Sequence, residues 1–308
     1  MRFVVSFLVA VLLLGPPSHA QQMRKVNPPD DCLDLLNANP STGLLDWRDL
    51  VEVEHCDRIK RLQRIAALRG DGADVEFYDG EVLASELPPD VDVRIPILRV
   101  VFRDRVFFNT DSSELRPEAY EIVDIVAHSL RFELPDVALF VAGHADARGD
   151  EDYNLNLSVD RANALAEAVM SSGVNQASVW RIGFGEDLPL VAGSNPYAWG
   201  QNRRIEFLFA ARSEALASFM VKQQIDMSCQ GKSIAETDEC RRTLNLKENY
   251  DIIEVASTEL SVSPNQSSST ADVQSRRETV APATRKIRID PTNGRYTIVN
   301  PVNNNSTP

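Results

Sequence analysis

Hydrophobic and polar positions follow two different periods along the middle of the chain, between about residues 98 and 210. Residues 115–130 and 157–171 place apolar side chains at every third or fourth position, which predicts two amphipathic helices. Pro117 suits the first turn of the earlier helix, and Gly173 suits the C-terminal cap of the later one. The apolar face of the earlier helix consists of Leu115, Ala119, Ile122, Val123, Val126 and Leu130.

Strands are predicted around these helices, at residues 98–108, 137–142, 179–184 and 203–209. Residues 137–142 are apolar throughout, as in a strand buried on both faces, whereas the last two segments alternate. Between those two, residues 185–201 form a long loop with room for one helical turn. The order predicts an α+β sandwich with helices packed on one face of a mixed sheet. The short connections to the last two strands favour antiparallel additions.

Both flanks of this region predict further helical structure. Residues 21–97 are expected to form a helical arm or small subdomain, with a basic helix that ends at Gly70 and an irregular connection after it. Residues 211–257 predict a C-terminal helical extension, with a helix over 212–224 and a weaker helical pattern over 246–257. The central domain is therefore expected to carry helical flanking segments.

Residues 258–308 predict a largely disordered tail, because the stretch SVSPNQSSST cannot bury enough apolar area to offset the entropy of ordering. Residues 285–299 alternate around an Asn-Gly turn, which is typical of a hairpin. An isolated hairpin is marginally stable in water, so it would need to pair with a partner or with the rest of the chain.

Residues 1–20 have the pattern of a secretory signal peptide, with Arg2, an apolar run from Phe3 to Leu14, helix breakers, and small residues before Gln21. A helix over that run rises only about 18 Å, against a hydrocarbon core of about 30 Å. A cleaved signal is therefore favoured over a membrane anchor, and we expect no transmembrane segment in the mature chain.

The cysteine count is even, which in an exported chain predicts two disulfides with three possible connectivities. We favour the local pairs Cys32–Cys56 and Cys229–Cys240. His55 adjoins Cys56, but no C-x-x-C spacing accompanies it, so a metal site is disfavoured. No metal or cofactor is expected.

Charge and missing motifs narrow the function classes. The net charge of -13 and a pI near 4.8 argue against a nucleic-acid partner, since such binders usually show a basic face. The sequence contains neither H-E-x-x-H nor G-x-S-x-G, so no catalytic residues are predicted, and a hydrolase stays the less favoured alternative to a binding protein.

Five short motifs follow one another between about residues 99 and 210. They are Phe107-Phe108-Asn109-Thr110-Asp111-Ser112; Gly143-His144-Ala145-Asp146 with Gly149; Asn154 with Leu157-Ser158 and Arg161-Ala162; Gly183-Phe184-Gly185 with Pro189; and Asn202-Arg203-Arg204-Ile205-Glu206. Together they resemble the OmpA-like peptidoglycan-binding domain family. The resemblance implies a βαβαββ fold and binding of peptidoglycan at the diaminopimelate of its stem peptide.

The resemblance also implies which residues bind. Asp146 and Arg161 would be the main contacts, since an acid and a base suit the ammonium and carboxylate on the free end of diaminopimelate. Asn154 and Arg203 would be supporting contacts, and Asn109 or Asp111 further ones. The implied location is the periplasm of a Gram-negative bacterium, with outer-membrane association and an envelope protein bound by the flanks as further expectations.

Some residues depart from the family pattern and leave alternatives open. Ala145 replaces the usual Thr, Asn109 stands where Asp is common, and Ala198-Trp199-Gly200-Gln201 lacks a basic residue. Asp146 and Arg161 could form only a structural ion pair, and Arg204 could only solvate the sheet. The alternative function is an OmpA-like scaffold that has lost its ligand and mediates protein–protein contacts.

Overall fold

A computed structural model describes most of the central part of the chain and short pieces of both flanks. The described residues are 23–26, 47–68, 74–133, 137–229, 236, 239–240, 251–255, 285–289 and 296–299. The predicted signal peptide, Cys32, and most of the predicted tail lie outside them. Among the described residues, no helix combines the length and apolar character needed to cross a bilayer.

All described strands belong to one sheet, in the order β1-β2-β3-β6-β4-β5-β7-β8-β9. Neighbours pair antiparallel throughout, except β4 and β5, which pair in parallel. The strands are β1 (Arg24–Lys25), β2 (Val75–Val82), β3 (Ile95–Arg103), β4 (Ala138–His144), β5 (Ser178–Gly183), β6 (Arg204–Ala210), β7 (Ile252–Val255), β8 (Lys286–Ile289) and β9 (Tyr296–Val299).

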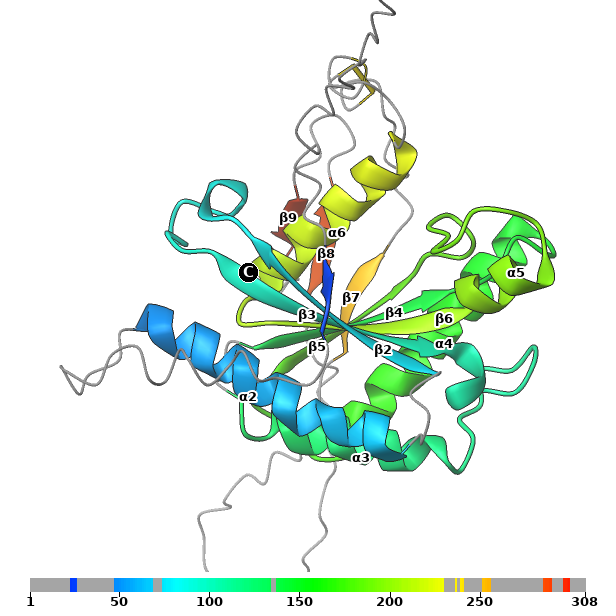
Figure 1. Cartoon of the computed structure of the whole chain (residues 1–308), viewed down its shortest axis with the longest axis horizontal. Coiled ribbons are helices and arrows are strands. Elements are labelled where there is room, and N and C mark those ends of the chain that lie inside the picture. Colours follow the sequence, from blue (N-terminus) through cyan, green and yellow to red (C-terminus); the bar gives the residue numbers. More distant parts are fainter. Residues whose placement is uncertain are drawn as a thin grey trace, which may run out of the picture.

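Helices cover both faces of this sheet (Figure 1). The helices α2, α3 and α4 pack on one face, and α6 packs on the other, so the predicted mixed-sheet α+β fold is confirmed and the C-terminal helix adds a second layer. Their bounds are α2 (Trp47–Leu68), α3 (Ala119–Leu130), α4 (Glu151–Ser171), α5 (Pro196–Asn202) and α6 (Ser213–Ser228), with 3-10 turns η1 (Ala84–Glu86) and η2 (Asp104–Val106).

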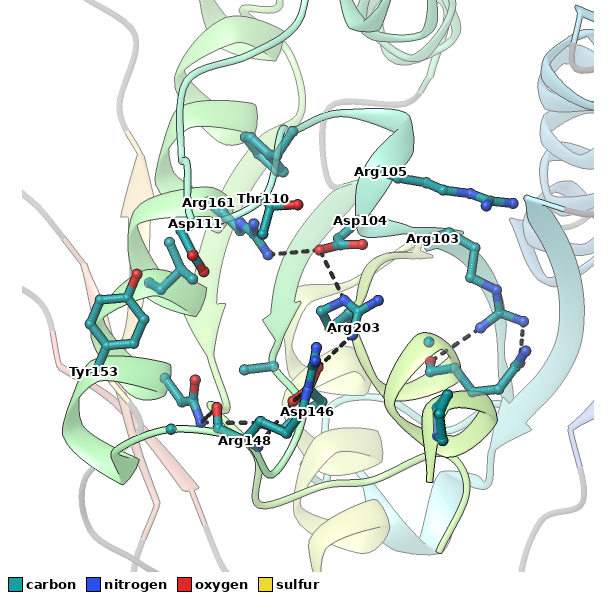
Figure 2. A pocket seen from close by; sticks show the side chains of 18 of the residues that line it. Arg103, Asp104, Arg105, Thr110, Asp111, Asp146, Arg148, Tyr153, Arg161 and Arg203 are labelled. Carbon is teal, nitrogen blue, oxygen red and sulfur yellow. Dashed lines mark hydrogen bonds and ion pairs between the residues drawn. The ribbon is translucent and has the colours of Figure 1, made fainter. Parts of the chain in front are cut away.

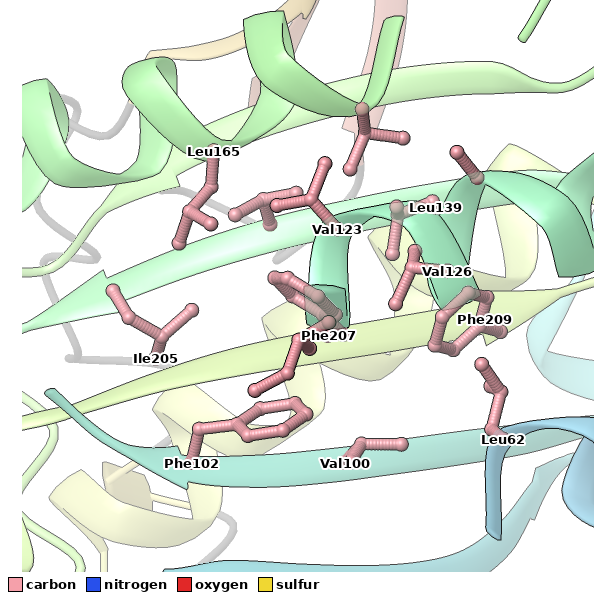
Figure 3. Packing of buried hydrophobic residues seen from close by; sticks show 14 of the residues in the cluster. Leu62, Val100, Phe102, Val123, Val126, Leu139, Leu165, Ile205, Phe207 and Phe209 are labelled. Carbon is pink, nitrogen blue, oxygen red and sulfur yellow. The ribbon is translucent and has the colours of Figure 1, made fainter. Parts of the chain in front are cut away.

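The larger core lies under α2, α3 and α4. Figure 3 shows Leu62 of α2, Val126 of α3 and Leu165 of α4 packed against Phe207 and its neighbours on the central strands. These side chains are fully buried, which explains why the apolar face of the 115–130 segment is so regular.

Several predicted elements differ in detail. The strand β5 is parallel to β4, not antiparallel, because the crossover through α4 returns the chain in the same direction, and only β6 is an antiparallel addition. The helix α3 starts at Ala119, because Leu115 pairs with Phe108 in an isolated bridge. The helix predicted over 246–257 is wrong for the residues of this segment that the structure describes, because Ile252–Val255 is a strand paired with β5.

The flanks share the sheet with the central region. The boundary expected after residue 97 falls inside β3, because β2 pairs with β3 along its whole length. The hairpin expected over 285–299 is present as β8 and β9, and it pairs with the rest of the chain through β7.

Of the predicted disulfides, Cys229–Cys240 is confirmed, with a Cα–Cα distance of 5.9 Å. Cys56 is also disulfide-bonded, but Cys32, its predicted partner, lies outside the described residues. The Cys32–Cys56 pairing therefore stays a prediction.

Candidate functional site

A pocket of about 880 Å³ lies where β4 ends, between the segment that follows β3, the start of α4, and α5 (Figure 2). Its lining is rich in charge. The charged lining residues are Arg103, Asp104, Arg105, Asp111, Asp146, Arg148, Arg161 and Arg203. Five arginines against three aspartates make this a cationic spot on a protein whose formal net charge is -13.

Two glycines of the sequence motifs let α4 pack directly on the sheet. A Cβ at Gly143 would lie 2.1 Å from the carbonyl oxygen of Ser158, and one at Gly183 would lie 2.5 Å from Cγ2 of Val159. Such contacts are sterically impossible, so any side chain at either position would push α4 away. The glycines therefore set the depth at which α4 presents Arg161 to the pocket.

Arg161 enters the pocket from α4 and is only 3% exposed. Its guanidinium donates to the carbonyl oxygens of Ser112 (2.9 Å) and Asn109 (3.2 Å), and to Oδ2 of Asp104 (3.0 Å). Its Cζ also lies 5.2 Å from the centre of the Phe108 ring. The segment that follows β3 thus fixes the position and orientation of this cation.

Asp146 lies at the foot of the pocket, two residues after the end of β4, and is 4% exposed. Its carboxylate accepts from Nε and Nη2 of Arg148 (2.9 and 2.8 Å), and from Nη1 of Arg203 (2.6 Å). Burial would raise the pKa of Asp146, but the hydrogen bonds from these two guanidinium groups outweigh it and lower that pKa. The side chain is therefore ionised at neutral pH.

Asp146 and Arg161 do not form the ion pair considered from sequence, because each is paired with another residue of the pocket. Arg203 connects the two: it binds Asp146, and its Nε lies 3.7 Å from Oδ2 of Asp104, the partner of Arg161. Figure 2 shows the resulting row of alternating charges, from Arg148 to Arg161. Within this row Asp146 and Arg161 are each paired with other residues, so the two do not neutralise each other directly.

The other predicted residues take different positions. Asn154 lines the pocket, and its amide donates to the carbonyl oxygen of Asp146 (3.0 Å) and to Glu186 (2.7 Å), so it holds the loop that carries Asp146. Asp111 is exposed on the rim, in the left-handed region at φ 54°, which Asp tolerates. The side chain of Asn109 does not line the pocket; its carbonyl oxygen holds Arg161.

Two charged members of the row, Asp104 and Arg148, were not predicted from the sequence. Asp104 lies in a short charged insert between two apolar strand segments, and that interruption of the hydrophobic pattern is the signal that could have revealed it. Arg148 occupies a position that the motif leaves variable, so no pattern pointed to it. Its Cζ lies 4.8 Å from the ring centre of Trp199.

A second charged cluster lies buried behind the pocket. Glu206 accepts from Nε of Arg99 (2.8 Å) and Nε of Arg204 (2.6 Å), so Arg204 is an internal ion-pair partner and does not solvate the sheet. His144 is buried and stacks on Phe184, with ring centres 5.0 Å apart. Burial and the charge of Arg204 hold the pKa of His144 well below its usual range, so this imidazole is neutral.

Among the described residues, no group of three or more His, Cys, Asp or Glu side chains could hold a metal ion. The pocket instead presents fixed charges of both signs. Such an arrangement suits a small ligand with both an ammonium and a carboxylate.

Comparison with known proteins finds similarity over the central region, which contains most of the pocket lining. The model of the OmpA family matches residues 107–204. The peptidoglycan-associated lipoprotein of Pseudomonas aeruginosa is 36% identical over 100 residues, which are 32% of this chain and 58% of that protein. The peptidoglycan-binding protein ArfA of Mycobacterium tuberculosis is 26% identical over 218 residues, 64% of this chain and 65% of its own.

Among solved structures, the peptidoglycan-associated lipoprotein from Burkholderia pseudomallei is 28% identical, with a TM-score of 0.30, over 34% of this chain and 87% of that one. The chain spans less than two thirds of the length of the curated relatives it matches. The family-model match lies in the central region, which holds most of the pocket lining. Residues 107–204 of this chain are an OmpA family domain.

Proposed function

We propose that this chain is a non-catalytic peptidoglycan-binding protein, which holds the diaminopimelate of a stem peptide in the pocket between Asp146 and Arg161. One observation carries the proposal: a carboxylate and a guanidinium line the same pocket, and each is held in place by other residues. The names of the relatives, which describe peptidoglycan-associated and peptidoglycan-binding proteins, support the same ligand.

Arg161 keeps the donors that a carboxylate needs. A guanidinium has five N–H donors, and the hydrogen bonds to Ser112, Asn109 and Asp104 use one on each nitrogen. One N–H therefore remains on each terminal nitrogen, and this pair can hold a ligand carboxylate in a forked geometry. Asp146 would accept from the ligand ammonium at the other side of the pocket.

The proposed location follows from the ligand. A protein that binds the wall of a Gram-negative bacterium acts in the periplasm, and an exported precursor with a secretory signal fits that place. We propose that the flanks bind a second envelope component, in or near the outer membrane. The match to the family model ends before α6 and the β7–β9 extension, so these segments are additions to the family domain.

Sedimentation with purified sacculi tests the proposal. We expect wild type to sediment with sacculi, and Asp146→Ala and Arg161→Lys to stay in the supernatant, because each removes one of the two fixed groups. Asp124→Ala and Arg131→Lys are matched controls, since Asp124 on α3 and Arg131 at its C-terminal cap form an exposed pair outside the pocket lining. Melting temperatures of all variants show whether loss of binding reflects unfolding.

One observation favours the scaffold alternative: the oxygens of Asp146 are already occupied by Arg148 and Arg203. Titration with a diaminopimelate-containing tripeptide separates the two functions. If wild type and Asp146→Ala sediment equally and the tripeptide does not bind, the pocket is not a wall site and the scaffold function stands.

A further inference from the structure

The Asp146 carboxylate has its acceptor positions filled. Oδ1 accepts from the backbone N–H of Arg148 (3.0 Å) and from its Nε (2.9 Å), while Oδ2 accepts from Nη2 of Arg148 (2.8 Å) and Nη1 of Arg203 (2.6 Å). A carboxylate offers about four lone-pair sites, so these four bonds saturate it. A ligand ammonium must therefore replace one of these donors.

Among these donors, the Arg148 guanidinium is the one that can leave at the lowest cost. The backbone N–H is fixed by the chain, and Arg203 also lies near Asp104, so its departure would break two charge contacts. The Arg148 side chain is 53% exposed. Asp146 is buried, but water already solvates the Arg148 side of the pair, and fully exposed ion pairs contribute only about 0.2–1 kcal/mol.

The released side chain would stay at the pocket. Its guanidinium already lies over the Trp199 ring, and the charge of Asp111 on the rim also attracts it. A cation above an aromatic face keeps part of its interaction energy when its carboxylate partner is lost. Displacement of Arg148 thus costs less than its bidentate contact with Asp146 implies.

We propose that Arg148 occupies, in the free protein, the place on Asp146 that the ligand ammonium takes, and that it thereby sets the specificity of the pocket. This inference rests on the proposed function. A simple amine gains little on binding, because it only exchanges one cation for another on Asp146. A ligand that also offers a carboxylate to Arg161 gains a contact without an equivalent loss, so the exchange selects zwitterions over amines.

The test pairs one variant with one change in the ligand. The full mature chain is titrated with a tripeptide that ends in diaminopimelate, and with the same tripeptide acetylated on its free amine. The proteins are wild type, Arg148→Ala, and the control Arg105→Ala, which removes the same charge from a 70% exposed side chain that lines the same pocket.

We expect Arg148→Ala to bind the free-amine tripeptide about 1.5- to 5-fold more tightly than wild type, because the competitor is gone. Its affinity for the acetylated tripeptide should not rise. Arg105→Ala should change both affinities by one common factor. In the NMR spectrum, the Nε–H signal of Arg148 should shift on addition of the free-amine tripeptide and stay in place with the acetylated one.

Weaker binding of the free-amine tripeptide by Arg148→Ala, or an equal gain for both tripeptides, would overturn the inference and leave the proposed function intact. An unmoved Nε–H signal at saturation would overturn it as well. If none of the three proteins binds either tripeptide, the proposed function itself has failed.

Discussion

Glu206 is 1% exposed on β6, and its oxygens accept hydrogen bonds from Arg99 and Arg204. Burial would raise the pKa of this carboxyl group, but the charges of Arg99 and Arg204 hold it well below its usual range. The group therefore stabilises the folded state only while it is ionised. Because Arg204 is adjacent to Arg203, this cluster also supports the wall of the pocket.

Glu206→Gln should lower the free energy of unfolding at pH 7 by about 3–5 kcal/mol, because it leaves two buried guanidinium groups without their carboxylate. Since the pKa of Glu206 is lower in the folded state, its contribution is complete above the unfolded value of about 4.3 and is lost as pH falls through the folded value. Urea denaturation from pH 7 to pH 3 measures this difference.

The gap between wild type and Glu206→Gln should therefore shrink below about pH 4. Glu114→Gln, a change at an exposed position, serves as the control and should have little effect throughout. A gap of the same size at pH 3 and pH 7 would contradict the role given to the Glu206 charge.

For single residues, the sequence predicted which side chains line the pocket better than it predicted their ion-pair partners. Asp146, Arg161 and Asn154 were predicted because their motifs could be recognised, and all three line the pocket. Asp104 was not predicted, because its ion pair with Arg161, which is far away in sequence, depends on how the elements pack. Arg148 was not predicted, because the motif leaves its position variable. The role of Asp146 and Arg161 in ligand binding stays a proposal.

Among the elements, α4 determines most of the site geometry. It starts at Glu151, six residues before the predicted start at Leu157, because Asp150 caps it by accepting from the backbone N–H groups of Asp152 and Tyr153. The first turns carry mostly polar residues, which hides them from an apolar periodicity. Helix type and central span were thus predictable, whereas the start depended on a cap.

Gly183→Ala should destabilise the protein by about 1–3 kcal/mol and weaken sacculus binding, because the added Cβ would lie 2.5 Å from Val159 and push α4, with Arg161, away from the pocket. Gly200→Ala, in α5, is a control for stability alone, because an added Cβ there meets no atom within 4 Å but Gly200 lines the pocket. The control should be neutral or slightly stabilising.

Thermal melting of both variants and sacculus sedimentation of Gly183→Ala check the prediction. Equal stability of Gly183→Ala and wild type would mean that α4 is not held as closely as described. Normal stability with lost binding would instead place Gly183 at the ligand itself.

At the scale of the whole molecule, segments from both ends of the chain extend one sheet. The flanks add β1 and β2 at one side of the central strands and β7, β8 and β9 at the other. On the face of α2, buried Arg58 donates to Glu133, which lies 75 residues further along the chain. Sequence predicted these flanks as separate additions, because strand pairing between distant segments leaves no local pattern.

Ile287→Ala should lower the free energy of unfolding by about 2–5 kcal/mol, because Ile287 of β8 is 0% exposed and belongs to the core under α6. Arg288→Ala, one residue along the same strand and exposed, should cost less than about 0.5 kcal/mol. Neither change should alter sacculus binding, since neither residue lines the pocket. Urea denaturation and sedimentation measure the two effects.

A negligible cost for Ile287→Ala would show that β8 is not docked on the sheet in solution. Loss of binding at unchanged stability would show that the C-terminal strands reach the wall site.

Arg203 contacts Asp146 at the pocket, and the next residue, Arg204, begins the strand β6, which pairs with β3 on one side and β4 on the other. A pull from a tethered polymer would therefore reach the middle of the sheet through a single peptide unit. There the load would be shared between the two ladders of backbone hydrogen bonds that β6 forms. If the chain binds the wall as proposed, the contacts with the ligand, and not the sheet, would therefore give way first under load.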